Sequence, residues 1–169
     1  MDMGPPSVSD ARLRITPVRS RIDVEATGRL FDAYASSLGV DLAYQDFATE
    51  LATLPGKYAP PAGELLLARD SDGEPLGCVA LRAMQPDGCC EMKRLYVAPQ
   101  ARGLGLGRAL VDAIIGEAVR IGYREMRLDS LPTMTEAIAL YRGKGFVPIA
   151  PYYDTPVAGT VFLAKPLTE

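Results

Sequence analysis

The sequence predicts an α/β fold with one mixed, mostly antiparallel sheet of about seven strands and helices on both faces. Two observations carry this prediction. Short segments of alternating apolar and polar residues are joined by tight turns in the middle of the chain, and segments with helical spacing alternate with strand-like segments after it. Tight turns favour antiparallel neighbours, whereas strand-helix-strand crossovers favour parallel ones. The sheet should therefore contain both kinds of pairing.

The first third of the chain is predicted to hold one strand and two helices. Residues 1–10 are expected to form a flexible tail, and residues 11–169 a single domain, because 169 residues suffice for one core. Alternation predicts a strand over residues 13–17. Apolar residues at helical spacing predict a helix over residues 22–38 and a shorter one over residues 46–54, which Pro55 and Gly56 end.

The middle of the chain is predicted to form three strands, over residues 64–69, 75–84 and 90–97. The turns DSDGE and QPDG link them, so an antiparallel meander is the natural arrangement.

The last third is predicted to alternate helices and strands. A long apolar stripe begins at Leu106 and predicts a helix that Gly122 ends. Strands are expected over residues 125–130, 146–149 and 160–164. A further helix lies between the first two, with its apolar residues at i, i+3, i+4 and i+7: Met134, Ala137, Ile138 and Tyr141.

The composition excludes several classes of protein. The chain has no histidine, which removes Ser-His-Asp and Cys-His catalysis and most zinc sites, and we expect no metal. A net charge of -3 argues against a general nucleic-acid binder. The three cysteines are odd in number and lack the spacing of a metal knuckle, which indicates reduced thiols. With no apolar run long enough to cross a bilayer, we expect a cytoplasmic protein without a membrane partner.

The stretch QARGLGLGRAL, residues 100–110, places three glycines on alternate positions just before the long helix. A helix N-terminus exposes unpaired backbone N–H groups and the positive end of the helix dipole, so a bare loop leading into it favours an approaching phosphate. From Glu91 to Arg108 the chain carries four positive residues and one negative residue. This segment therefore predicts an anionic ligand, although a plain connecting turn is the simpler alternative.

The two common nucleotide-binding loops fit this stretch poorly. A P-loop needs Lys and Ser or Thr after its last glycine, and here Arg108 and Ala109 follow Gly107. A dinucleotide fold needs G-x-G-x-x-G near its first strand, whereas Gly103 and Gly105 begin a G-x-G-x-G in mid-chain. A nucleotide-binding oxidoreductase is thus disfavoured.

Three features together resemble the GNAT superfamily of N-acetyltransferases. Gln100, Gly103 and Gly105 match its Q-x-x-G-x-G loop after the strand EMKRLYV. The A-x-x-L-Y and G-F of AIALYRGKGF follow at the expected distance, and the predicted element order matches the GNAT fold. The resemblance covers nearly the whole chain. One position departs from it, since many relatives carry Asn where this chain has Met134.

The resemblance implies an acetyl-CoA-dependent N-acetyltransferase that acts by direct transfer in a ternary complex. Backbone amides of the glycine loop would hold the pyrophosphate of coenzyme A, and the end of the preceding strand would pair with its pantetheine arm. A backbone N–H on that strand, at Val97, would polarise the thioester carbonyl. The implied cofactor-binding residues are Leu95, Tyr96, Val97, Arg102, Gly103, Leu104, Gly105, Leu106, Gly107 and Arg108.

Two catalytic roles are expected. Tyr141 occupies the tyrosine place of the family motif and would protonate the departing thiolate, although it could equally be a core aromatic residue. An alkyl ammonium must lose a proton before it attacks, and Glu91 is the first candidate base. Asp129 at the end of the next strand, or a chain of water molecules, is the alternative.

By family analogy the acceptor lies between the loop joining the first two helices and the last hairpin. The segments LAYQDF and PYYDTP in these places are rich in tyrosine and carboxylate, which suit the amine of a small polar or cationic molecule. The candidate acceptor residues are Tyr44, Asp46, Asp129, Tyr152 and Tyr153. A homodimer is common among relatives. The rival hypothesis is a coenzyme A-binding module with little or no catalysis that acts through protein partners.

Overall fold

The computed structural model describes residues 13–167, so the predicted tail over residues 1–10 lies outside the described part of the chain. Its strands form one seven-stranded sheet in the order β1-β2-β3-β4-β5-β7-β6. All neighbouring strands are antiparallel except β4 and β5, which are parallel. The strands are β1 (Arg14–Pro17), β2 (Glu64–Arg69), β3 (Pro75–Met84), β4 (Cys89–Val97), β5 (Glu125–Ser130), β6 (Val147–Pro148) and β7 (Val161–Pro166). The predicted mixed sheet is confirmed.

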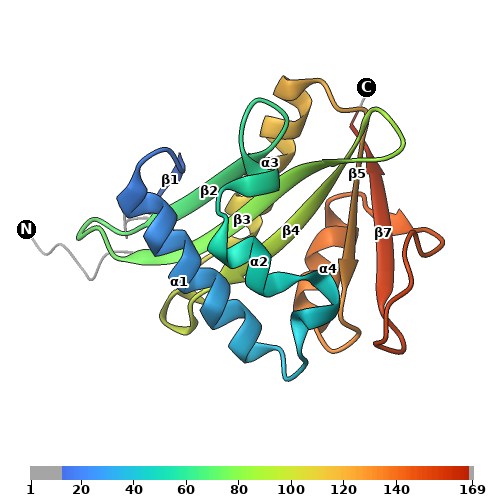
Figure 1. Ribbon diagram of the computed structural model, residues 1–169, viewed down its shortest axis with the longest axis horizontal. Coiled ribbons are helices and arrows are strands. Elements are labelled where there is room, and N and C mark those ends of the chain that lie inside the picture. The colour runs from blue at the N-terminus through green and yellow to red at the C-terminus, as the bar shows by residue number, and fades with distance from the viewer. Residues whose placement is uncertain (1–12, 168–169) are drawn as a thin grey trace, which may run out of the picture.

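Four α-helices accompany the sheet. In Figure 1, α1 and α2 lie in front of the strands and α3 lies behind them, so the sheet has helices on both faces. The helices are α1 (Arg21–Ser37), α2 (Phe47–Ala52), α3 (Leu106–Ile121) and α4 (Thr135–Gly143). Three short 3-10 segments join these elements: η2 (Leu42–Gln45), η3 (Gly56–Tyr58) and η4 (Pro99–Ala101).

Helix α1 begins where its sequence supplies a cap. Ser20 has extended backbone, and its Oγ accepts a hydrogen bond of 3.1 Å from the backbone N–H of Asp23, which satisfies one of the free donors of the first turn. The helix buries Ala26 and Phe31 completely against the sheet. Phe31 meets the ring of Tyr58 edge to face, with centroids 6.1 Å apart. This contact ties the segment after α2 to α1.

Helix α3 packs closely on the back of the sheet. It buries Leu110 and Ile114 completely and leaves its charged side outward, as its apolar stripe predicts. Gly77 on β3 permits this approach, because a Cβ there would lie 2.9 Å from the backbone oxygen of Tyr96 and 3.0 Å from Leu110. The N-terminus of α3 is therefore held firmly beside the end of β4.

Strands β4 and β5 separate after a short stretch of pairing. Their last paired residues are Glu91 and Arg127, although β4 continues to Val97 and β5 to Ser130. Strand β4 also carries one extra residue opposite Val79, and at this bulge Arg94 has a φ of 59°. The edge of β4 beyond Glu91 thus has no strand partner on the β5 side.

Among residues 13–167, no helix combines the length and the apolar character that crossing a membrane requires. The three cysteines are free and buried, as expected for reduced thiols.

Candidate active site

A groove of about 570 Å³ runs between the end of β4, the N-terminus of α3 and the start of α4. Its walls combine residues from the glycine loop with residues of α4. They include Val97, Arg102, Gly103, Arg108, Met134 and Leu140. The structure thus joins the glycine loop to the A-x-x-L-Y segment, as the resemblance implies.

The first turn of α3 is open at its N-terminal end. Gly105 precedes the helix with a φ of 80°, a conformation that L side chains rarely adopt, and no side chain caps the turn. A Cβ built on Gly103 or Gly105 would meet no atom within 4 Å. Arg108 lies exposed in the same turn, where a cation opposes the helix dipole. Backbone donors and positive charge are therefore available to an anion here.

The backbone of Val97 faces the open edge of β4. The N–H of Ala98 donates a 2.8 Å hydrogen bond to the carbonyl of Leu76 on the β3 side. Because bonded and non-bonded residues alternate along an antiparallel pair, Val97 directs its own N–H and carbonyl away from β3. The carbonyl accepts a hydrogen bond of 3.1 Å from Nε of Arg102. The edge is therefore able to pair with an extended ligand once this side chain moves.

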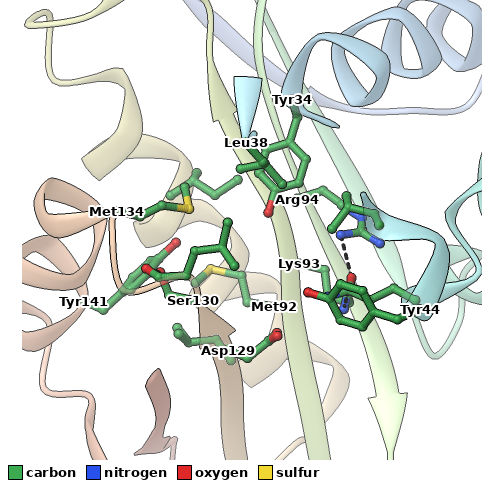
Figure 2. Close-up of a pocket in the computed structure, with 15 residues that line it drawn as sticks. Tyr34, Leu38, Tyr44, Met92, Lys93, Arg94, Asp129, Ser130, Met134 and Tyr141 are labelled. Carbon is green, nitrogen blue, oxygen red and sulfur yellow. Dashed lines mark hydrogen bonds between the residues drawn. The ribbon is translucent and has the colours of Figure 1, made fainter. Parts of the chain in front are cut away.

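A second pocket lies on the other side of the β4–β5 gap, and we call it the central pocket. It shares Leu95 and Met134 with the groove, so the two spaces meet at these residues. Figure 2 shows Met134 and Tyr141 on one side of the pocket and Tyr34, Lys93 and Tyr44 on the other. The two pockets thus lie next to each other where the strands separate, and together we call them the two-armed site.

Tyr141 stands on the wall of the central pocket, near Met134 (Figure 2). Its side chain is buried, and its ring packs on Phe146 with centroids 5.9 Å apart. Burial raises the pKa of Tyr141 above its ordinary value. The residue is thus both a packed aromatic and a hydroxyl beside the junction.

Glu91 is buried within a short chain of contacts. Nε of Arg82 lies 2.8 Å from one carboxylate oxygen, and the hydroxyl of Tyr152 donates a hydrogen bond of 2.6 Å to the other. Burial alone would raise the pKa of Glu91, but the charges of Lys93 and Arg82 and these hydrogen bonds hold it below its ordinary value. Glu91 is not among the residues that line the central pocket.

Asp129 lines the central pocket from the β5 side. It accepts a hydrogen bond on Oδ2 from the hydroxyl of Tyr153. Tyr152 and Tyr153 both pack their rings edge to face on Phe162 of β7. Tyr152 therefore contacts the candidate base Glu91, and Tyr153 contacts the candidate base Asp129.

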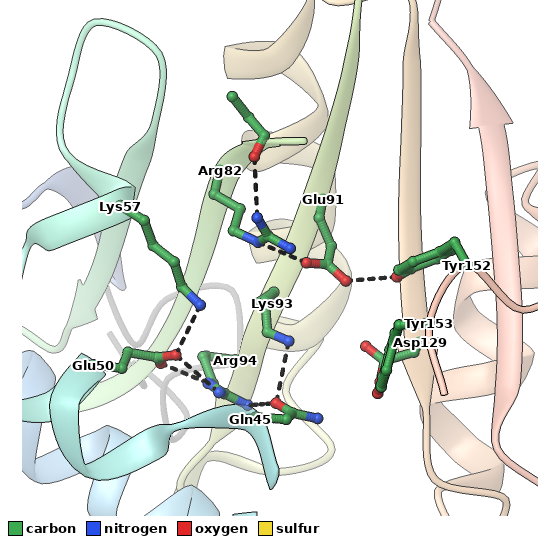
Figure 3. A network of polar contacts seen from close by, with 11 residues as sticks. Gln45, Glu50, Lys57, Arg82, Glu91, Lys93, Arg94, Asp129, Tyr152 and Tyr153 are labelled. Atoms are coloured by element: carbon green, nitrogen blue, oxygen red, sulfur yellow. Dashed lines mark hydrogen bonds and ion pairs between the residues drawn. The ribbon is translucent and has the colours of Figure 1, made fainter. Parts of the chain in front are cut away.

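A buried polar network, shown in Figure 3, fixes the loop before α2 to β4. Arg94 pairs with Glu50 through Nε, 2.7 Å from Oε2, and through Nη2, 2.9 Å from Oε1. Oε1 of Gln45 accepts hydrogen bonds from Nη1 of Arg94 at 2.8 Å and from Nζ of Lys93 at 3.1 Å. The network presents Lys93 to the central pocket.

Sequence reasoning missed this network and also Tyr34, which lines the central pocket and lies edge to face with Tyr96. A signal for Lys93 and Arg94 was present, because charged residues inside a strand predicted to be buried need partners. Their partners lie 44 to 49 residues earlier in the chain, and no local pattern links them.

Three predicted site residues lie apart from the site. Tyr96 buries its side chain against Tyr34, and its backbone pairs with Cys78 on β3, so neither part faces the groove. The side chain of Leu104 packs on the core, while its backbone lies between Gly103 and Gly105, which line the groove. Asp46 is exposed, starts α2 in a left-handed conformation and lines a different pocket. Tyr44, in contrast, lines the central pocket.

A metal ion is bound by a cluster of side chains that supply its ligands. Among residues 13–167, no three His, Cys, Asp or Glu side chains gather in a way that could hold a metal ion.

The fold and the two-armed site together define a class of protein, an α/β protein with two neighbouring pockets at the gap between two strands. The chain belongs to the acetyltransferase (GNAT) family, whose model matches residues 29–146. The protein is therefore an acetyltransferase, an enzyme of acyl transfer.

Similar proteins agree with this assignment. The chain is 42% identical to an uncharacterized N-acetyltransferase of Schizosaccharomyces pombe over 94% of this chain and 98% of that protein. It is 29% identical to an uncharacterized N-acetyltransferase of Dictyostelium discoideum, over 80% of this chain and 90% of the other. A crystal structure of a Klebsiella pneumoniae protein assigned as an acyl-CoA N-acyltransferase superposes with a TM-score of 0.72 at 29% identity. The superposition covers 94% of this chain and 99% of the Klebsiella pneumoniae chain.

Proposed function

We propose that this enzyme moves an acetyl group from acetyl-CoA directly to a primary amine of a small molecule while both are bound. The observation that carries the proposal is the junction of groove and central pocket at Leu95 and Met134. A donor in one arm and an acceptor in the other would meet there. Holding two reactants in contact removes much of the entropic part of the barrier.

The groove residues fit acetyl-CoA, which supplies the thioester. The uncapped amides at the start of α3 would bind the pyrophosphate, and the exposed side chains of Arg102 and Arg108 would add positive charge. The open backbone edge at Leu95 and Val97 would pair with the pantetheine arm like an added strand. For that pairing, the side chain of Arg102 would release the carbonyl of Val97 and contact the ligand instead.

Tyr141 is the proposed proton donor to the thiolate. Because burial raises its pKa, the phenol stays protonated through the neutral range. A phenol of ordinary pKa about 10 is a weaker acid than a thiol of about 8.5, so its proton would move as the thiolate leaves. Its place beside Met134 at the junction supports this role.

Asp129 is the proposed base, because it lines the central pocket while Glu91 does not. An alkyl ammonium has a pKa of about 10.4 and must lose a proton before attack. Glu91 would act through Tyr152 and intervening water, and its lowered pKa makes it a weaker base than an ordinary glutamate. Glu91 thus stays a candidate for an indirect role.

A coenzyme A-binding module of low activity is the second candidate. It is favoured by the state of Glu91, whose two oxygens are both engaged in contacts within the fold. In that case the central pocket would serve no acceptor.

The test is the release of free thiol from acetyl-CoA across a panel of primary amines. Tyr141→Phe should lower kcat by about 10²- to 10⁴-fold and leave the calorimetric Kd for acetyl-CoA unchanged. Tyr123→Phe is the matched control, because its hydroxyl bonds to the backbone of Ala62 outside the site. Binding without thiol release from any amine would favour the module. The absence of acetyl-CoA binding would overturn both candidates.

A further inference from the structure

Two opposite charges face each other across the gap between β4 and β5. The parallel register ends at Glu91 and Arg127, and two residues further along each strand lie Lys93 and Asp129. Both side chains line the central pocket. Figure 2 shows the carboxyl group of Asp129 directed toward the side of the pocket where Lys93 and Tyr44 lie. Within residues 13–167, no ion pair within 4.0 Å joins them.

The neighbouring charges are already neutralised. Arg94 forms a two-point pair with buried Glu50, and Arg82 pairs with Glu91 at 2.8 Å (Figure 3). The central pocket therefore presents one cation and one anion, Lys93 and Asp129, that the fold itself has not paired.

Both groups retain hydrogen-bonding capacity. Nζ of Lys93 donates to Oε1 of Gln45, which uses one of its three N–H groups. Asp129 accepts from Tyr153 on Oδ2, and its Oδ1 has no recorded partner in the described chain. The hydroxyl of Tyr44 accepts from the Gln45 amide at 3.1 Å and keeps its own proton to donate.

Partly buried charges of this kind are costly without a counter-ion. Burial lowers the pKa of Lys93 below its ordinary value, although the negative charges of Glu91 and Asp129 act in the opposite direction. A ligand that brings a negative group to Lys93 and a positive one to Asp129 would remove both costs.

We propose that the acceptor is an amino acid, whose carboxylate binds Lys93 and the hydroxyl of Tyr44 and whose amine lies at Asp129. This assignment rests on the proposed acetyl transfer and narrows its acceptor class. Asp129 and Tyr141 both line the central pocket, which shares Leu95 and Met134 with the groove. Asp129 takes the proton that the ammonium group loses, and the amine nitrogen forms the new bond to the acetyl carbon as the carbon–sulfur bond breaks.

The experiment compares the common L-amino acids with their carboxamides, which keep the amine and lose the negative charge. Thiol release from acetyl-CoA should give a kcat/KM at least tenfold higher for the best acid than for its carboxamide. Lys93→Met should bring this ratio close to one, Lys93→Arg should keep part of it, and the Kd for acetyl-CoA should not change. Lys57→Met is the control, because Lys57 contacts Glu50 at 3.3 Å and does not line the central pocket.

Each outcome decides a separate point. Equal use of acids and carboxamides, or a preference that survives Lys93→Met, overturns the amino-acid assignment and leaves acetyl transfer intact. Release of thiol from other amines alone also overturns the amino-acid assignment. If neither these compounds nor any other primary amine releases thiol, acetyl transfer fails instead. Calorimetry of the same amino acids with coenzyme A-saturated protein then decides the assignment. Binding that Lys93→Met abolishes supports it, and no binding overturns it.

Discussion

The hydroxyl of Tyr152 donates a hydrogen bond of 2.6 Å to Oε2 of Glu91, which joins the segment before β7 to the middle of β4. Arg82 holds the other oxygen at 2.8 Å. A buried carboxylate therefore keeps its charge through the nearby cations Lys93 and Arg82 and through the hydroxyl of Tyr152, which reaches it from a distant segment.

Replacing Tyr152 by Phe should raise the pKa of Glu91. Burial already raises it, and Tyr152 is one of the groups that outweigh burial. A carboxyl group with a lowered pKa stabilises the folded state above its unfolded pKa and loses this contribution as pH falls through the folded value. The variant should lose about 1–3 kcal/mol near neutral pH and unfold at a higher pH on acidification.

Urea unfolding of the Tyr152→Phe variant at a series of pH values measures both effects. Tyr153→Phe, which removes a neighbouring hydroxyl from Asp129 and likewise keeps its ring on Phe162, is the control for loss of a tyrosine hydroxyl that does not contact Glu91. An acid midpoint identical to that of the wild type would contradict the role given to Tyr152.

The Arg94–Glu50 pair should dominate the polar contribution to stability on this face. Both side chains are buried, so Glu50→Gln would leave the guanidinium of Arg94 without its counter-charge. We expect a loss of about 3–5 kcal/mol in the free energy of unfolding, measured with urea at neutral pH. Lys57→Met, which removes a more exposed cation from the same carboxylate, should cost less than about 1 kcal/mol. Similar costs for the two variants would contradict this assignment.

Gly105→Ala should weaken acetyl-CoA binding more than it weakens the fold. Its φ of 80° strains any other residue by about 1–2 kcal/mol, and the added methyl group would stand in open space beside the first amides of α3. We expect the calorimetric Kd to rise at least tenfold, equivalent to about 1.4 kcal/mol. Gly73→Ala carries the same strain at a φ of 83° in a distant turn and should leave Kd unchanged. An equal effect of both variants on Kd would assign the change to stability alone.

Met134→Asn should stabilise the start of α4. Met134 occupies the N-cap position, and no side chain accepts a hydrogen bond from the first turn. An asparagine there supplies that acceptor, which is worth about 0.5–2 kcal/mol, less the loss of partly buried thioether. Met134→Ala loses the same packing without gaining a cap and should be less stable than both other forms in urea unfolding. A Met134→Asn variant no more stable than Met134→Ala would contradict the capping argument.

The elements of this fold could be predicted from the sequence because each carries its own periodicity and its own stop signal. The bounds of β2, β3 and β5 agree with the predicted strands residue for residue, and Gly122 ends α3 as predicted. The 3-10 segments were not anticipated, because a single turn such as η2 is too short to show a period. Its start depends on the side chain of Asp41, which accepts a hydrogen bond of 2.9 Å from the backbone N–H of Ala43.

The site could be predicted only where a motif is local. The glycine loop and Tyr141 belong to continuous segments, and the structure brings both to the two-armed site. Tyr96 points away from the groove that its neighbours Leu95 and Val97 line, because consecutive residues of a strand face opposite ways and strand pairing decides which backbone edge stays open. The Lys93–Gln45–Arg94 network depends on tertiary contacts that no spacing in the sequence encodes.

The single extra residue at Arg94 shifts the alternation of side chains between the two faces of β4. Before Arg94, alternation places the side chains of Glu91 and Lys93 on the face that holds Gln45. After Arg94, the side chains of Leu95 and Val97 line the groove. Lys93 and Arg94 both contact Gln45, so the bulge places two consecutive side chains on one face of the strand and Leu95 and Val97 at the groove. Regular pairing of the same residues, without the bulge, would exchange the faces of all the side chains that follow it.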